Sequence, residues 1–340
     1  MPVIERNDLD QQIWDEELAD FVPSKVFDAH THIYRWVDNI DPDKQNGPFS
    51  SFVRPEFEHA SWDLLDECDH ILMPGRSVQR LSFPFPFPQC DFDGSNAFIT
   101  GEVSPHPQSG ALTLVHPSMT ADQVDATVRA GGFLGLKPYR FYSSTGDPVE
   151  CRITDFMAEH QIAVADQHGL IIMMHLSRSR GISDEQNLDD LEWLTTKYPR
   201  VRWILAHCAR SYSSWPIEKA GNRLRDLPNI WCDTSSVCES DAVEALLRTI
   251  GVDRVMYGSD DVPVGVLRGK YVAFGFGWAY LSEENHSLNL SHCDPRMTFT
   301  RYEGLRAMQR AARSVGLTRD EIQAMFHDNA VSLIEQVRSQ

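Results

Sequence analysis

The sequence predicts an α/β fold, a (β/α)8 TIM barrel with extended βα loops at the C-terminal face of the barrel. Eight short apolar segments recur along the chain, and amphipathic helical segments separate many of them. Near-continuous apolar runs are typical of parallel strands that are covered on both faces. A length of 340 residues also suits a single barrel of this type.

The order of the predicted elements follows the strand–helix alternation of such a barrel. The eight predicted strands lie at residues 25–30, 68–74, 111–117, 133–139, 169–175, 201–207, 229–235 and 253–259. Predicted helices lie at residues 120–130, 153–168, 184–198 and 240–250, and several begin at a Ser, Thr or Asp suited to an N-cap. An open doubly wound sheet is the main alternative, but no glycine-rich phosphate loop follows the first strand.

The domain organisation is predicted to be simple. Residues 1–24 are expected to form an N-terminal helical extension, and residues 25–340 a single barrel domain. Three long segments follow predicted strands, at residues 47–57, 73–97 and 262–299. Because active sites of barrels lie at this end of the strands, these loops are candidate lids, with surface decoration as the alternative. We expect the FPFPFP run at residues 83–88 to be a stiff loop rather than an apolar wall.

Charge and composition exclude several classes of partner. A formal net charge of −18 argues against nucleic acid or an anionic membrane surface as the main partner. No window is apolar enough to span a bilayer. The seven cysteines are scattered without CxxC spacing, and the acidic N-terminus lacks the apolar core of a secretory signal, so we expect a cytoplasmic protein. A small anionic substrate remains compatible, because a local arginine cluster dominates within a screening length of about 8–10 Å.

Polar side chains stand at the ends of the predicted strands. They are His30 and His32 on the first strand, Lys137 on the fourth, His175 on the fifth, His207 on the sixth and Asp260 after the eighth. Residues two apart in a strand face the same way, so both imidazoles of the HxH pair point to one side. Three or four N and O ligands with an open position are typical of a catalytic divalent ion. We therefore expect a divalent metal cofactor, with zinc as the first choice and manganese, iron or cobalt as alternatives.

The ordered motifs DAHTH, GLKPY, IIMMH, WILAHC and YGSDDVP resemble those of the amidohydrolase superfamily. They look most like the amidohydrolase 2 branch of small metal-dependent hydrolases and decarboxylases. The tail GLTRDEIQAMFHDNAVSLI is similar to the closing helix of that branch. The resemblance covers roughly Lys25 to the C-terminus and implies a barrel with a metal at its C-terminal face.

The resemblance also implies roles for individual residues. The implied metal ligands are His30, His32, His175 and Asp260. His207 becomes either a further ligand or the residue that polarises the substrate or moves a proton, and Asp260 also accepts a proton from the metal-bound water. Lys137 is a carboxylated bridge between two metals in binuclear relatives, but in the mononuclear branch it is usually not a ligand, and we favour the second role.

Several cationic and aromatic residues follow the same strands and are candidates for substrate binding. They are Arg35, Arg140, Tyr142, Arg178 and Arg210. Guanidinium groups recognise carboxylates and phosphates through paired hydrogen bonds, which suggests an anionic small-molecule substrate. Ion pairs with neighbouring acidic residues are an equal alternative.

Together these observations lead to one expected function and two alternatives. We expect a metal-dependent hydrolase in which metal-activated water attacks a C–N, C–O or lactone carbonyl of a small, carboxylate-bearing substrate. The first alternative is a non-oxidative decarboxylase or hydratase of an aromatic or unsaturated acid. The second is a barrel that binds metal and ligand without turnover. Barrels of this type are often dimers, so a homodimer is one of the states left open.

Overall fold

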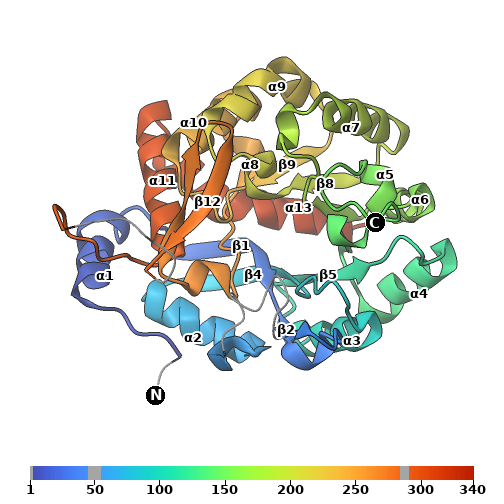
Figure 1. The fold of residues 1–340 in the computed structure, drawn as a ribbon, viewed down its shortest axis with the longest axis horizontal. Helices are drawn as coiled ribbons and strands as arrows, with labels where there is room; N and C mark the ends of the chain where they lie inside the picture. The colour runs from blue at the N-terminus through green and yellow to red at the C-terminus, as the bar shows by residue number, and fades with distance from the viewer. Residues whose placement is uncertain (1–2, 45–54, 284–290) are drawn as a thin grey trace.

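The computed structural model describes residues 3–44, 55–283 and 291–340. Its main sheet has eight strands in the order β1-β4-β5-β6-β7-β8-β9-β10, and every neighbouring pair is parallel (Figure 1). The strands are β1 (Lys25–His32), β4 (Ser77–Phe83), β5 (Gly110–Val115), β6 (Gly135–Pro138), β7 (Ile171–Met174), β8 (Arg202–Leu205), β9 (Ile230–Asp233) and β10 (Val255–Met256). The sheet closes where Thr31 pairs with Asp261 and where the Asp260 amide donates to the His30 carbonyl at 3.0 Å. The predicted (β/α)8 barrel is confirmed.

Helices surround this barrel and bury the outer faces of its strands (Figure 1). The longer ones are α2 (Trp62–Leu72), α3 (Phe92–Val103), α4 (Ala121–Gly131), α6 (Glu159–His168), α7 (Glu185–Lys197), α9 (Ser214–Asp226), α10 (Ser240–Ile250), α11 (Thr300–Val315) and α13 (Asn329–Arg338). Short helices occur at α5 (Ile153–Phe156), α8 (Ala206–Arg210) and α12 (Arg319–Gln323). The helix predicted at residues 153–168 is therefore two helices, because Met157 leaves the helical conformation. No described helix is both long and apolar enough to cross a membrane.

The second predicted strand is wrong. Residues 68–74 belong to helix α2 and the turn that follows it, and the second barrel strand is β4. Ser61 caps α2 by accepting from the Leu64 amide at 3.2 Å, and the buried side chains of Leu65, Cys68 and Leu72 recur at helical spacing. Strand β4 is hidden in the sequence because Arg80 interrupts its apolar pattern, although this arginine is almost completely buried.

The N-terminal segment contains helical turns and packs on the outside of the barrel. Helix α1 (Asp8–Ile13) continues into a π-helical turn (Trp14–Leu18). Trp14 stacks on Tyr302 of α11 with ring centroids 6.0 Å apart. The division of the chain at residue 24 stays a prediction.

Two antiparallel elements lie in the segments that follow β1 and β10. Strand β2 (Tyr34–Arg35) pairs with β3 (His59–Ala60), and β11 (Gly269–Phe274) forms a hairpin with β12 (Gly277–Ser282). Both lie on the face of the barrel that Figure 1 presents. Residues 47–54 and 284–290 of the predicted long loops lie outside the described residues. The prediction that these loops act as lids therefore stays untested.

Candidate metal centre

His30, His207 and Asp260 form the centre of the candidate site. One ligand atom of each lies within 4.8 Å of those of the other two, and all three residues are buried. They come from β1, from the turn after β8 and from the loop after β10. It is the one such group of histidine, cysteine or carboxylate side chains in the described part of the chain.

Asp260 lies between the two histidines of the HxH pair. Its Oδ1 is 3.3 Å from Nε2 of His30 and 3.3 Å from Nε2 of His32. Its other carboxylate oxygen accepts a hydrogen bond from the Ser236 hydroxyl. Burial opposes ionisation, but these contacts with His30 and His32 outweigh it and hold the pKa of Asp260 well below its usual range. Asp260 therefore contributes one negative charge to the site at neutral pH.

A left-handed turn presents His207 to the site. Residues His207, Cys208, Ala209 and Arg210 have φ angles of 58°, 50°, 57° and 58°. The turn closes with a hydrogen bond of 2.9 Å from the Ser211 amide to the His207 carbonyl. Because L-residues avoid this region at a cost of roughly 1–2 kcal/mol each, four in succession mark a segment that the surrounding structure holds in place.

Asp233 lies behind both clustered histidines, at the end of β9. Its Oδ2 is 3.0 Å from Nδ1 of His30. Its Oδ1 accepts from the His207 amide at 3.0 Å and from the amide and hydroxyl of Ser235. Gly258 makes this approach possible, because a Cβ there would lie 2.9 Å from Cβ of His30. Asp233 was not among the residues predicted from the sequence, although it lies near the end of the predicted strand at residues 229–235.

His32 and His175 border the cluster without being part of it. The His32 ring centroid is 5.6 Å from that of His30, and the His175 centroid is 5.1 Å from that of His207. Burial lowers the pKa of His32 to about 4, which Asp260 only partly offsets. Burial and the nearby charges of His207, Arg210 and Arg140 hold the pKa of His175 well below its ordinary value. Both imidazoles are thus neutral at pH 7, the form in which histidine binds metals.

Lys137 is fully buried beside the cluster. Its Nζ has no hydrogen-bond partner among the described residues and lies over the rings of Phe83 and Tyr139, at 4.4 and 4.8 Å from their centroids. Burial lowers the pKa of Lys137 to about 7, and the charges of Asp233 and Asp260 offset this only in part. The side chain is therefore poised between the ammonium and the neutral amine at physiological pH.

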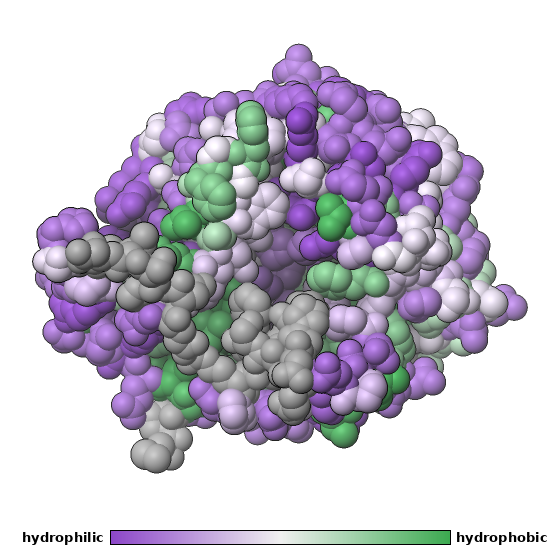
Figure 2. Space-filling model, in the orientation of Figure 1, coloured by the Kyte–Doolittle hydropathy of each residue, from purple (hydrophilic) through white to green (hydrophobic). Residues whose placement is uncertain are grey.

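Aromatic rings enclose the histidines on two sides. Phe83 packs edge-on against both His30 and His32, each at 4.8 Å, and Phe85 packs on His32 at 5.1 Å. The FPFPFP run continues as a loop after Phe83, as expected, and its Phe83 and Phe85 also form the apolar wall that was the alternative. On the other side Tyr212 stacks 6.2 Å from His207, and Trp278 of the hairpin stacks 4.8 Å from Tyr212. Figure 2 shows a hollow near the centre of this face, with a mostly hydrophobic ridge where Figure 1 places the hairpin.

Arg140 and Arg210 lie near the site without a carboxylate partner at ion-pair distance among the described residues. Nη1 of Arg140 donates to the Pro148 carbonyl at 2.6 Å, and Nη1 of Arg210 donates to the Arg178 carbonyl. Arg210 also lies 5.2 Å from the ring centroid of Trp278. Burial lowers the pKa of Arg210 to about 10, with a further contribution from Arg140. The charge of Arg140 thus acts on Arg210, and the charges of both guanidinium groups act on His175.

The other substrate-binding candidates are occupied by protein partners. Arg35 pairs with Asp38 at 2.7 Å. Arg178 pairs with Asp184 at 2.6 Å and with Glu150 at 3.2 Å. The Tyr142 hydroxyl donates to the Phe87 carbonyl at 2.8 Å, and its ring is buried. The structure does not bring these three residues to the cluster.

The residues present fit a divalent ion. Nε2 of His30 is buried without a hydrogen-bond partner, although it faces the ionised Asp260. Two imidazole nitrogens and one carboxylate oxygen form the N/O donor set that zinc and similar divalent ions prefer, and Asp233 supplies the carboxylate that commonly lies behind a ligating histidine. His30, His207 and Asp260 are therefore able to hold such an ion, with His32 and His175 next to them.

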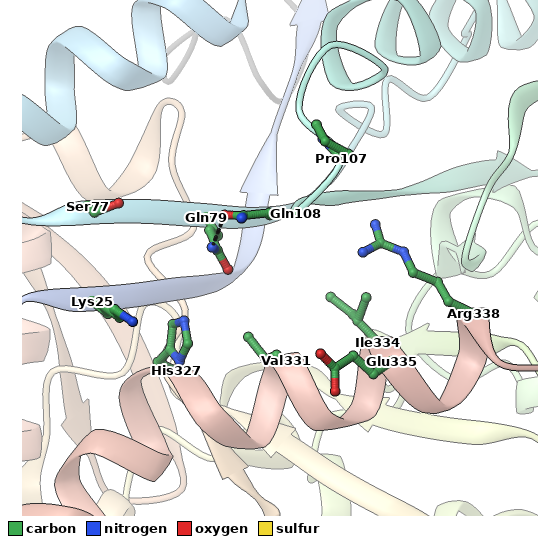
Figure 3. Close-up of a pocket in the computed structure, with 10 residues that line it drawn as sticks. All are labelled: Lys25, Ser77, Gln79, Pro107, Gln108, His327, Val331, Ile334, Glu335 and Arg338. Carbon is green, nitrogen blue, oxygen red and sulfur yellow. Dashed lines mark hydrogen bonds between the residues drawn. The ribbon is translucent and has the colours of Figure 1, made fainter.

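A separate cavity lies at the opposite end of the barrel. It has a volume of about 390 Å³ and is lined by the amino-terminal ends of β1 and β4, the loop before β5, and α13 with the turn that precedes it (Figure 3). Its charged groups include Lys25, Glu335 and Arg338, and Arg338 already donates to the Ser109 carbonyl at 2.6 Å. None of the candidate site residues lines it.

Comparison with solved structures shows the same fold in several enzymes. An amidohydrolase from Burkholderia multivorans matches with a TM-score of 0.60 and 15% identity when it holds HEPES, over 91% of this chain and 99% of that chain. In a second crystal form, with bound zinc, the TM-score is 0.58 and the identity 14%, again over 91% and 99%. A putative 2-pyrone-4,6-dicarboxylic acid hydrolase from Pseudomonas putida matches with a TM-score of 0.56 and 14% identity, over 92% of this chain and 98% of that one. A dihydroxybenzoic acid decarboxylase from a Polaromonas species, with bound manganese and the inhibitor 2-nitroresorcinol, has a TM-score of 0.55 and 13% identity over 92% and 97%.

Sequence comparison identifies the family. No curated protein matches the chain. A family model described as amidohydrolase, however, matches residues 90–335, which is well over half of the chain. The expected resemblance is thereby confirmed. The chain is an enzyme of the amidohydrolase family.

Proposed function

We propose that the protein is a metal-dependent hydrolase of a small, carboxylate-bearing substrate. The observation that carries this proposal is the convergence of His30, His207 and Asp260 within 4.8 Å at the carboxyl ends of the barrel strands. The core ligand set is His30, His207 and Asp260, and His32 and His175 are retained as further ligands expected from the sequence. Zinc is the preferred ion, with manganese next, and both are found in solved structures of the same fold.

A divalent ion at this position would lower the pKa of a coordinated water toward about 7 and so supply a nucleophile for a C–N, C–O or lactone carbonyl. The ionised Asp260 carboxylate lies where it can accept the proton that the nucleophile releases. The rings of Phe83 and Phe85 line one side of the histidine pair and lower the local polarity. In such surroundings, fixed charges and dipoles act on developing charge more strongly than they do in water.

The substrate is proposed to be anionic because Arg140 and Arg210 have no acidic partner within ion-pair distance in the described residues. Their charges both act on His175, so a carboxylate held between them would lie beside the cluster. Such a carboxylate would also relieve the repulsion between the two guanidinium groups. Arg35 and Arg178 are excluded from this role in the proposal, because protein carboxylates already satisfy them.

The proposal is tested by turnover of a panel of small carboxylate-bearing lactones, esters and amides by the zinc- and manganese-loaded protein in ¹⁸O-labelled water. We expect one labelled oxygen in the product, loss of activity on chelation, and a fall in kcat of at least about 100-fold in Asp260→Asn. Asp190→Asn is the matched control, because Asp190 is fully buried in α7 and pairs with Arg152 instead. Full activity in Asp260→Asn would contradict the proposal.

A decarboxylase of an aromatic or unsaturated acid is the second candidate. Arg140 and Arg210 favour this reaction as well, since these arginines without an acidic partner would orient the carboxylate that is lost as carbon dioxide. Release of carbon dioxide without ¹⁸O in the organic product would identify this reaction and exclude hydrolysis. A cytoplasmic location is also proposed, because the six buried cysteines of the described residues form no disulfide: Cys68, Cys90, Cys151, Cys208, Cys232 and Cys238.

A further inference from the structure

Asp233 makes four polar contacts that connect the two clustered histidines. Its Oδ2 lies 3.0 Å from Nδ1 of His30. Its Oδ1 accepts from two backbone amides, that of His207 at 3.0 Å and that of Ser235 at 3.1 Å, and also from the Ser235 hydroxyl. Asp233 is fully buried, so water does not compete for these contacts. One carboxylate therefore serves both the β1 histidine and the turn that carries the β8 histidine.

The contact with His30 fixes which ring nitrogen carries the proton. An ionised carboxylate only accepts hydrogen bonds, so Nδ1 of His30 must be the protonated nitrogen that faces Oδ2. In the neutral imidazole the lone pair is then on Nε2. That atom has no hydrogen-bond partner among the described residues and lies 3.3 Å from Oδ1 of Asp260. The lone pair of His30 is thus directed into the cluster.

Ser235 fixes His207 in the same state. Nδ1 of His207 lies 2.9 Å from the Ser235 carbonyl oxygen, which can only accept, so this nitrogen carries the proton. The Ser235 hydroxyl is also 2.9 Å from Nδ1 of His207, and it can accept there because its own hydrogen is donated to Asp233. The lone pair of the neutral His207 ring is again on Nε2.

We propose that Asp233 is a positioning residue that sets the tautomer of His30 directly and holds the Ser235 segment, whose carbonyl sets the tautomer of His207. Both imidazoles then present Nε2 lone pairs to the same point. That these lone pairs bind a metal ion rests on the proposed function, whereas the assignment of the tautomers is independent of it. A carboxylate behind a ligating histidine is worth about 10–100-fold in metal affinity in sites of this chemistry.

The isosteric variant Asp233→Asn gives a specific expectation. Three donors converge on the position of Oδ1, so the amide oxygen of the asparagine is held there. Its NH2 group then faces Nδ1 of His30, which must become the bare acceptor. The His30 proton moves to Nε2, and the lone pair is withdrawn from the cluster. His207 keeps its tautomer, because the Ser235 carbonyl is unchanged.

The experiment is ¹⁵N NMR of the histidine-labelled, metal-free full-length protein, with His30 assigned by comparison with His30→Gln. We expect a protonated Nδ1 on His30 in the wild type and a bare Nδ1 in Asp233→Asn. A parallel titration with zinc alone should show zinc affinity lowered by about 10–100-fold in Asp233→Asn. Asp190→Asn, a change at an equally buried aspartate far from the cluster, should alter neither readout. Ser235→Ala should leave the His30 Nδ1 proton in place.

The outcomes separate this inference from the proposed function. A wild-type His30 with a bare Nδ1, or an Asp233→Asn protein that keeps this proton, would overturn the inference. If Asp233→Asn does not fold, the wild-type spectrum decides alone, because it shows directly whether Nδ1 is protonated. A wild type that has the expected tautomer but binds no zinc would support the inference and contradict the metal proposal.

Discussion

Replacement of Lys137 by methionine should stabilise the metal-free protein, and the gain should shrink as the pH rises. Burial lowers the pKa of this lysine from 10.5 to about 7. The pKa of Lys137 is lower in the folded protein than in the unfolded one, so its charged form destabilises the folded wild type. This destabilisation is complete below pH 7 and fades as the pH approaches 10.5. The difference in pKa corresponds to a destabilisation of about 5 kcal/mol at pH 6, of which roughly 1 kcal/mol remains at pH 10. The variant loses the cation–π contacts with Phe83 and Tyr139, and this loss reduces the gain in stability by roughly 1–2 kcal/mol.

The assay is urea unfolding of the metal-free wild type and Lys137→Met at pH 6 and pH 10. We expect the variant to be more stable by about 3–4 kcal/mol at pH 6 and nearly equal to the wild type at pH 10. Lys219→Met is the control, because Lys219 is exposed on α9 and its replacement should give no such pH dependence. A variant that is less stable than the wild type at pH 6, or a gain that does not change with pH, would refute the reasoning.

Three further predictions follow from the same geometry. Arg210→Met or Arg140→Met should weaken the binding of a carboxylate substrate by about 10–100-fold, as measured by KM or calorimetry, whereas Arg178→Met should change it little because Arg178 is already paired with Asp184. Ala209→Gly should raise the free energy of unfolding by up to about 1 kcal/mol in thermal or urea unfolding, since Ala209 has a φ of 57°; a loss of stability would count against strain in this turn. Asp233 raises the pKa of His30 despite burial, so protons should compete with zinc more strongly as the pH falls from 8 to 6, and a zinc affinity independent of pH would contradict this.

The site was predictable from the sequence where a single rule applied. The carboxyl ends of parallel strands meet at one face of a barrel, so polar residues that follow apolar runs converge there. That rule placed His30, His207 and Asp260 at one face, together with His32, Lys137 and His175, and the family resemblance then suggested their roles. Applied evenly, it would also have identified Asp233, which lies two residues before the end of the predicted strand at residues 229–235.

Other features depend on tertiary contacts that a sequence does not display. Strand β4 was missed because the buried Arg80 breaks its apolar pattern, and only the fold shows that Asp69 and Asp66 neutralise it. The left-handed turn at His207 contains no glycine, which is the residue that would have predicted it from the sequence. The sequence could not distinguish Arg140 and Arg210 from Arg178. Whether an arginine has a carboxylate partner depends on how the loops fold against one another. The pairing of Arg35 with Asp38, three residues away, was by contrast open to prediction.

The most direct test of the proposed metal centre is zinc binding by the metal-free wild type and by Asp260→Ala, measured by calorimetry and by metal analysis after dialysis. We predict one zinc ion per chain in the wild type and loss of this ion in Asp260→Ala. The Asp260 carboxylate of the wild type contacts both histidines of the HxH pair. A wild type without zinc affinity, or an Asp260→Ala protein with the affinity of the wild type, would contradict the assignment of this site.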